Sequence, residues 1–302
     1  MRFQFSRRQF FTALAGLTTF AFHTSSANAA EPASGPLVVK RDVFYTAAQD
    51  KLQALDLYAP AGAKKQPVVL WIHGGGWKGG DKGSVQKKPQ AFTAQGYILA
   101  SANYRLLPAA TVQDSIADLA KAVRWLHDHA AEYGGDPNSI LVLGHSAGAH
   151  LAALLCTDHR YLQAEGLSLS LLKGCAPLDV SAYDIPKRLQ EGGSAGITAS
   201  FLSVFGDSTE NQRQLSPVTH IAPGKNIPPF LIFHVASRDD TKAQAHWLQS
   251  KLQAAGIPAR VHAAEGKTHG SIGSDLGLDT DLPTQELWKF LHTAAPAPEA
   301  GK

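Results

Sequence analysis

A serine stands at the centre of a glycine-flanked motif in the middle of the chain. The motif GHSAG spans Gly144 to Gly148; an apolar strand-like run precedes it and an apolar helical stretch follows it. A serine on so tight a strand-to-helix turn projects from the edge of a sheet, where the positive end of the helix dipole points. We therefore predict that Ser146 is a nucleophile that forms an acyl-enzyme.

A serine hydroxyl is a weak nucleophile at neutral pH, so the chain must also supply a base. Of the 13 histidines, His269 is best placed, in a glycine-flanked loop between the last predicted strand and the last predicted helix. His262 is the alternative, but it falls inside the strand pattern, where packing is its expected role. We predict that His269 is the general base.

An acid should orient this histidine and stabilise the imidazolium that forms during the reaction. After the strand predicted at 228–237, the sequence SRDDT offers two adjacent aspartates, Asp239 and Asp240. We predict that Asp240, next to the start of a helix, is the acid. Asp239 is the alternative, and is otherwise a solvated or helix-capping charge.

A second glycine-rich stretch, LWIHGGGWKGG, spans Leu70 to Gly80. It places three consecutive glycines directly after a buried strand. Glycine gives up packing and costs conformational entropy, so three in a row indicate that another group must approach the backbone closely.

An alternation of apolar runs and helical patterns positions these motifs. Strands are predicted at 37–46, 51–60, 67–74, 97–105, 139–145, 171–179, 228–237 and 258–265, and helices near 86–95, 113–131, 241–255 and 283–293. Continuous apolar strands that alternate with helices form a mostly parallel sheet covered on both faces. We predict one α/β domain over residues 30–302, with a cap-like insertion at 181–228, where no strand pattern occurs.

The first 29 residues have the pattern of an export signal. Paired arginines, Arg7 and Arg8, precede a short apolar run and an Ala-Asn-Ala box, as in a cleaved twin-arginine signal peptide. The apolar run is too short to span a bilayer, so we predict no stable membrane anchor and a periplasmic or secreted mature protein. Its removal takes away three arginines and no acidic residue, which leaves a formally neutral chain with no case for a nucleic-acid partner.

The two cysteines, Cys156 and Cys175, are too few for a disulfide framework, and both lie in apolar contexts. We predict buried packing residues, with a single disulfide as the alternative. The sequence has no Cys/His cluster typical of a metal site, and the predicted chemistry needs no organic cofactor. The expected partner is a small-molecule ester.

Together these motifs resemble those of the α/β-hydrolase superfamily, in its hormone-sensitive-lipase-like esterase group. The resemblance covers nearly the whole mature chain and rests on HGGGW (73–77), ANYRL (102–106), YGGDPNSILVLGHSAGAHLAAL (133–154) and a late Asp/His pair. It implies an eight-stranded, mostly parallel sheet flanked by helices. Two positions depart from the family pattern. Four residues after His234, where the family usually has its aspartate, this chain has Arg238, and Ala149 stands where many lipolytic members have glycine.

The resemblance also implies that the amides of Gly75, Gly76 and Ala147 form an oxyanion hole. Backbone N–H groups can point at a developing oxyanion only where no side chain blocks the approach. Trp77 is expected to be the first wall of a substrate pocket, with Phe201 and Phe205 of the insertion beside it.

The expected activity is hydrolysis of carboxylic esters with small to medium acyl groups. The GHSAGAH and HGGGW motifs also resemble those of kynurenine formamidase and feruloyl-esterase-like proteins, so an arylformamidase is one alternative. A non-catalytic binding protein that retains the fold is a second alternative, of another class.

Overall fold

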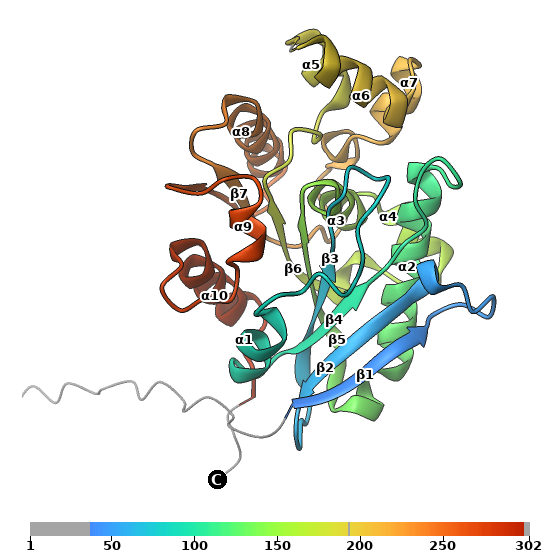
Figure 1. Ribbon diagram of the computed structural model, residues 1–302, viewed down its shortest axis with the longest axis vertical. Coiled ribbons are helices and arrows are strands. Elements are labelled where there is room, and N and C mark those ends of the chain that lie inside the picture. The colour runs from blue at the N-terminus through green and yellow to red at the C-terminus, as the bar shows by residue number, and fades with distance from the viewer. Residues whose placement is uncertain (1–36, 193, 299–302) are drawn as a thin grey trace, which may run out of the picture. The chain divides into compact units, whose positions relative to one another are not determined.

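An eight-stranded, mostly parallel sheet forms the centre of the fold (Figure 1). The computed structural model describes residues 37–192 and 194–298, so the predicted export signal lies outside the described residues. The strands are β1 (Leu37–Phe44), β2 (Ala54–Pro60), β3 (Gln66–Ile72), β4 (Ile98–Ala102), β5 (Gly135–His145), β6 (Leu172–Leu178), β7 (Phe230–Val235) and β8 (Ala259–Ala264). Each predicted strand segment overlaps one of them, although β5 begins four residues before its predicted segment, and this confirms the predicted sheet.

The strands lie in the order β1-β2-β4-β3-β5-β6-β7-β8. The pairs β1–β2 and β2–β4 are antiparallel, and all other neighbours are parallel. The ends of β5 and β6 are therefore neighbours at one edge of the sheet, with β3 and β7 on either side. Because the carboxyl ends of parallel strands meet at the same edge, this order brings several loops together there.

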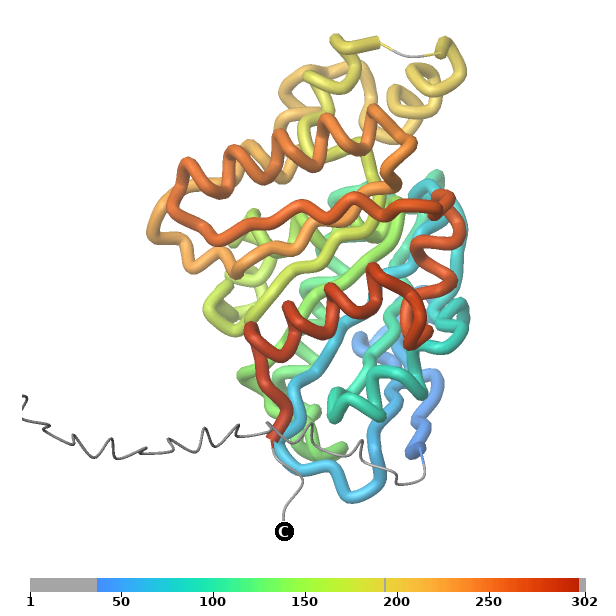
Figure 2. The backbone as a smooth tube through the Cα atoms, turned by 90° about the vertical axis from the view of Figure 1, so that its left-hand side faces the viewer, coloured from blue at the N-terminus to red at the C-terminus, as the bar shows by residue number. Residues whose placement is uncertain are grey.

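Helices cover both faces of the sheet (Figures 1 and 2). They are α1 (Lys88–Ala94), α2 (Val112–His129), α3 (Ala147–Thr157), α4 (His159–Ala164), α8 (Asp239–Ala254), α9 (Ser271–Ser274) and α10 (Leu282–Ala294). On one face α2, α3 and α8 pack into the larger apolar cluster. On the other, α1 and α10 pack into the smaller one, and Figure 2 shows α10, in dark red, lying in front of the strands. Burial on both faces explains why the inner strands β3, β4, β6 and β7 are apolar runs, whereas the edge strands β1 and β8 are partly exposed and carry polar residues.

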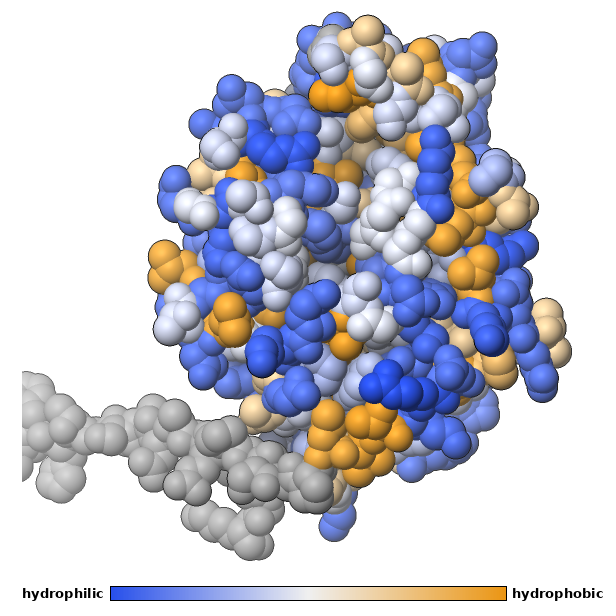
Figure 3. Space-filling view, in the orientation of Figure 1, coloured by the Kyte–Doolittle hydropathy of each residue, from blue (hydrophilic) through white to orange (hydrophobic). Residues whose placement is uncertain are grey.

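Between β6 and β7, where the sequence predicts an insertion, the chain forms α5 (Ile185–Gln190), α6 (Ala195–Phe205), α7 (Thr209–Gln214) and a short 3-10 helix, η4 (Pro217–His220). These helices lie at the top of Figure 1. Helix α6 has no charged residue and exposes Ile197 and Leu202, in the region where hydrophobic colour appears at the top of Figure 3. In the described part of the chain, no helix has the length and apolarity needed to cross a membrane.

Candidate active site

Ser146 lies on a strained turn between β5 and α3. Its backbone has φ 56° and ψ −124°, a conformation that side-chain-bearing residues rarely adopt. Only glycine fits at either of the glycine positions that flank this serine. A Cβ on Gly144 would overlap the carbonyl of Gly148, and a Cβ on Gly148 would overlap the carbonyl of Ile72. The close crossing of β3, β5 and α3 therefore requires glycine on both sides of the serine.

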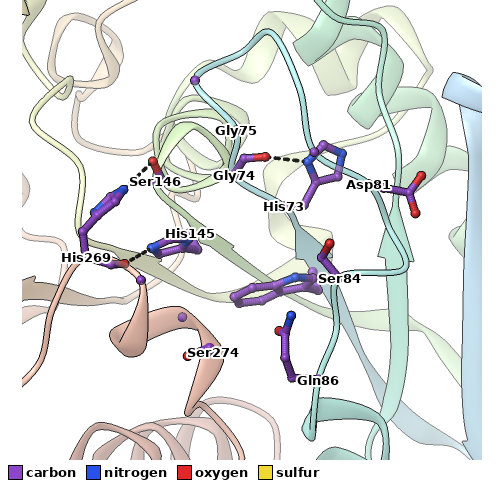
Figure 4. A pocket seen from close by; sticks show the side chains of 15 residues that line it. His73, Gly74, Gly75, Asp81, Ser84, Gln86, His145, Ser146, His269 and Ser274 are labelled. Atoms are coloured by element: carbon purple, nitrogen blue, oxygen red, sulfur yellow. Dashed lines mark hydrogen bonds between the residues drawn. The ribbon is translucent and has the colours of Figure 1, made fainter.

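His269 contacts this serine directly. Its Nε2 is 2.9 Å from Ser146 Oγ, and Figure 4 shows the imidazole pointing toward the hydroxyl. The histidine lies in the loop between β8 and α9, as the sequence analysis expected. His262, the alternative, lies within β8, where its ring packs edge-on against Phe233.

The acid that contacts His269 is Asp179, at the end of β6. Its Oδ2 is 2.7 Å from His269 Nδ1, and its Oδ1 accepts a hydrogen bond from the amide of Val235 at 2.9 Å. The side chain of Asp179 is fully buried. Burial alone would raise its pKa, but hydrogen bonds from His269, Val235 and Thr241 and the charge of Arg238 outweigh burial and lower the pKa. The carboxylate is therefore ionised at neutral pH.

The prediction that Asp240 orients His269 is corrected by this geometry. Asp240 lies in the first turn of α8 and pairs with Arg238, whose Nη2 is 3.2 Å from Asp240 Oδ2. The loop after β7 brings Arg238, rather than a carboxylate, to the histidine. One sequence signal did point to Asp179: it is the acidic residue that directly ends the apolar run LLKGCAPLD, on the strand next to the serine's own strand.

His145, which precedes the serine, holds the histidine loop. Its Nε2 lies 2.6 Å from the carbonyl oxygen of His269. Burial and the neighbouring His269 lower the pKa of His145 to about 4, so it is neutral at pH 7. Its Nε2–H can therefore donate to that carbonyl. A Cβ on Gly273 of α9 would press against the His145 ring, which shows how closely the loop packs on it. No motif in the sequence predicted this contact of His145 with the histidine loop.

The glycines after β3 bring free amides to the same edge of the sheet. Gly75 and Gly76 have φ values of 125° and 61°, and a Cβ on Gly75 would overlap the carbonyl of Gly79. Within residues 37–192 and 194–298, no acceptor contacts the amide of Gly75 or Gly76. Ala147 is the first residue of α3, so its amide has no partner inside the helix.

A cavity of about 460 Å³ opens beside Ser146, lined by glycines, polar side chains and Trp71 (Figure 4). Its polar lining includes Asp81, Ser84, Gln86 and Ser274, and no aliphatic side chain is among its lining residues. Burial alone would raise the pKa of Asp81, but hydrogen bonds from the Gly83 amide and the Asn103 side chain lower it. Asp81 is therefore ionised at neutral pH, with its carboxylate held by Gly83 and Asn103.

Trp77 does not line this cavity. It is buried, with 7% of its surface exposed, and its Nε1 donates to His150 Nδ1 at 3.2 Å. Its ring packs edge-on against Phe205 and Phe201 of α6, with centroids 5.0 and 6.4 Å apart. The three residues expected to form a pocket wall instead form an aromatic cluster that joins the insertion to the glycine loop.

Cys156 and Cys175 are buried and not bridged, as predicted for packing residues. Among the residues that the structure describes, no group of three or more His, Cys, Asp or Glu side chains is arranged to hold a metal ion.

The BD-FAE family model matches residues 55–252 of the chain. A probable isoprenylcysteine alpha-carbonyl methylesterase of Arabidopsis thaliana is 31% identical over 251 residues, which cover 78% of this chain and 51% of that protein. A probable carboxylic ester hydrolase of Mycobacterium tuberculosis is 33% identical over 177 residues, which cover 56% and 40%. The chain thus spans about half the length, or less, of these curated relatives.

Solved structures share the fold. A thermophilic esterase of the Planctomycetes species Thermogutta terrifontis superposes with a TM-score of 0.65 at 26% identity, over 89% of this chain and 96% of that one. The likeness confirms the fold class predicted from the sequence motifs.

Proposed function

The chain belongs to the BD-FAE family of the α/β-hydrolase superfamily, and from this membership and the geometry at Ser146 we propose that it is a carboxylesterase-type serine hydrolase. One observation carries the proposal: Ser146 Oγ, His269 and Asp179 form a hydrogen-bonded series with distances of 2.9 and 2.7 Å. This is the arrangement by which a histidine activates a serine and a carboxylate orients the histidine.

In the proposed reaction, Ser146 Oγ attacks the ester carbonyl carbon while His269 Nε2 takes the hydroxyl proton. The ionised Asp179 holds the Nδ1 proton of His269 and stabilises the imidazolium. His269 then gives its proton to the leaving alkoxide, and an acyl-enzyme and a free alcohol result. Water, activated by the same histidine, attacks the acyl-enzyme and releases the carboxylic acid.

The negative charge that develops on the carbonyl oxygen needs fixed donors. The amides of Gly75 and Gly76, together with that of Ala147 at the start of α3, are proposed as the oxyanion hole. Their lack of partners in the described chain supports this role. Losing one such donor typically costs about 10²–10³ in rate.

The cavity beside Ser146 favours short acyl groups. It has a volume of about 460 Å³, and no aliphatic side chain is among the residues that line it. A long alkyl group would find no aliphatic side chain to pack against, so its burial would contribute less to binding. We therefore propose esters with small to medium acyl groups as substrates.

The direct test is hydrolysis of p-nitrophenyl acetate by the purified mature chain and by its Ser146→Ala variant. The proposal predicts turnover by the wild type and loss of that turnover in the variant, with p-nitrophenyl acetate preferred over p-nitrophenyl decanoate. Equal rates in the two proteins, or no turnover of any ester in a panel of acyl lengths, would count against an esterase and favour a binding protein.

A further inference from the structure

A cation lies against the buried acid of the proposed triad. Arg238 Nη1 is 2.6 Å from Asp179 Oδ2 and 2.8 Å from His269 Nδ1. Asp179 Oδ2 is itself 2.7 Å from His269 Nδ1. The guanidinium and the imidazole thus meet at the same carboxylate oxygen, on a side chain that is fully buried.

The partners decide which atom carries the proton at this junction. A guanidinium only donates, and an ionised carboxylate only accepts. An unprotonated Nδ1 at 2.7 Å would place its lone pair against the carboxylate oxygen, so His269 Nδ1 carries a proton, and the 2.8 Å approach of Arg238 Nη1 to Nδ1 is a contact between two donors, not a hydrogen bond. Arg238 and His269 therefore both donate to Asp179 Oδ2, which is the tautomer that leaves Nε2 free to accept the proton of Ser146.

Arg238 is itself held from the other side. Its Nη2 is 3.2 Å from Asp240 Oδ2, and Asp240 also lies 3.9 Å from Arg188 Nη2. Since Asp240 is in the first turn of α8, the guanidinium is fixed between a helix start and the acid at the end of β6. A charged side chain fixed at both ends restricts the directions that its carboxylate partner can take.

We propose that Arg238 is a positioning residue, which holds the Asp179 carboxylate so that this acid directs His269 toward Ser146. Arg238 stands four residues after His234, where the family pattern usually has an aspartate. Arg238 is not among the residues that line the cavity, so it acts through Asp179 and not on the substrate. This inference rests on the proposed function, because it concerns the same serine chemistry.

The test is an Arg238→Ala variant assayed with p-nitrophenyl acetate. Loss of the guanidinium removes the partner of Asp179 Oδ2 other than His269 and leaves Oδ1 held by Val235, so the carboxylate can shift, and misplacement of a reacting group by about 1 Å can cost about 10²-fold in rate. We expect kcat to fall by about 10- to 100-fold, with KM unchanged. Added guanidinium or ethylguanidine should restore part of kcat, because the Arg238 side chain is one-third exposed and the space it leaves opens to solvent.

Arg105 provides a matched control elsewhere in the molecule. Its side chain is 33% exposed, as is that of Arg238, and its Nε donates at 2.7 Å to Asp118, which is fully buried. An Arg105→Ala variant should lose stability but keep the kcat of the wild type, and guanidinium should not change its rate. A fall in kcat in Arg238→Ala but not in Arg105→Ala would show that the effect comes from lost positioning of Asp179 and not from the loss of a structural ion pair.

An Arg238→Met variant keeps the length and packing of the side chain without its charge, and it decides the question if the alanine variant does not fold. The inference is overturned if a folded variant keeps wild-type kcat, if KM changes instead of kcat, or if guanidinium restores nothing in Arg238→Ala. Failure of the proposed function looks different, because the wild type would then hydrolyse no ester.

Discussion

At the scale of single residues, the chemistry depends on which carboxylate reaches His269. Asp179 and Asp240 both contact Arg238, but only Asp179 contacts His269 Nδ1, and its carboxylate is ionised inside the protein. Asp240 does not contact His269; it contacts Arg238, which lies between the two residues. Their substitutions should therefore have unequal effects on the rate.

An Asp179→Asn change should lower kcat for p-nitrophenyl acetate by about 10⁴-fold, because the amide no longer holds the productive tautomer of the histidine. Asp240→Asn should lower kcat far less, since it removes a partner of Arg238 and no contact to His269. The measurement is kcat of both variants, with circular dichroism to establish that each is folded. A larger loss in Asp240→Asn would return the role of the acid to Asp240.

The sequence was sufficient for two members of this site and not for the third. Ser146 lies in a glycine-flanked turn and His269 in a glycine-flanked loop, and these local patterns identify both residues as candidates from the sequence. The acid depends on how two loops from neighbouring strands curl over the sheet edge, and spacing along one loop does not determine this. The same limit applies to Trp77, whose neighbours come from α6.

At the scale of helices and strands, the close crossing of β3 and α3 holds the serine turn. The inner strands were predictable because burial on both faces requires an apolar run. The long helices were predictable because burial on one face requires apolar residues at helical spacing. The insertion helices were predicted only as a segment without strands, because their apolar residues do not follow a single buried face.

Because β3 and α3 cross closely, a side chain at Gly148 should lower the stability of the protein. Gly148→Ala would push a methyl group into the carbonyl of Ile72, so we expect a loss of about 1–3 kcal/mol in the free energy of unfolding. Gly196→Ala in α6 is the control: its Cβ would meet no atom within 4 Å, and alanine favours a helix. Urea denaturation of both variants tests the difference, and equal stabilities would contradict the tight crossing.

His150 links α3 to the glycine loop and to the insertion. Its Nδ1 accepts from Trp77 Nε1, and its Nε2 lies 2.7 Å from the carbonyl oxygen of Leu215. Burial lowers its pKa to about 4. Below pH 6.5 the unfolded chain therefore binds a proton that the folded chain does not, and the free energy of unfolding falls as the pH drops from about 6.5 to about 4.

His150→Gln should be less stable than the wild type at about pH 7 but should lose less stability between about pH 7 and pH 5. At about 1.4 kcal/mol per pH unit, the difference in this loss should approach 2 kcal/mol. The measurement is urea denaturation at both pH values, with His129→Gln, a change on the outer surface of α2, as the control. Parallel pH dependence in His150→Gln and the wild type would contradict the account.

At the scale of the whole molecule, the predicted export signal in the first 29 residues can be tested separately from the activity of the α/β domain. The predicted twin-arginine signal implies that the protein folds before export and acts in the periplasm or outside the cell, which we propose. In a bacterium with this pathway, replacement of both Arg7 and Arg8 by lysine should retain the protein in the cytoplasm. Cell fractionation measures this, and export of the double variant would exclude the twin-arginine route.

Ser146 is proposed to be a nucleophile activated within this fold, and covalent labelling of its hydroxyl would demonstrate that activation. The purified protein is treated with a fluorophosphonate, and intact-mass and peptide mass spectrometry locate the adduct. We expect one adduct per chain, on the peptide that contains Ser146, and none in Ser146→Ala. An unlabelled wild type, or an adduct on another residue that persists in Ser146→Ala, would contradict it.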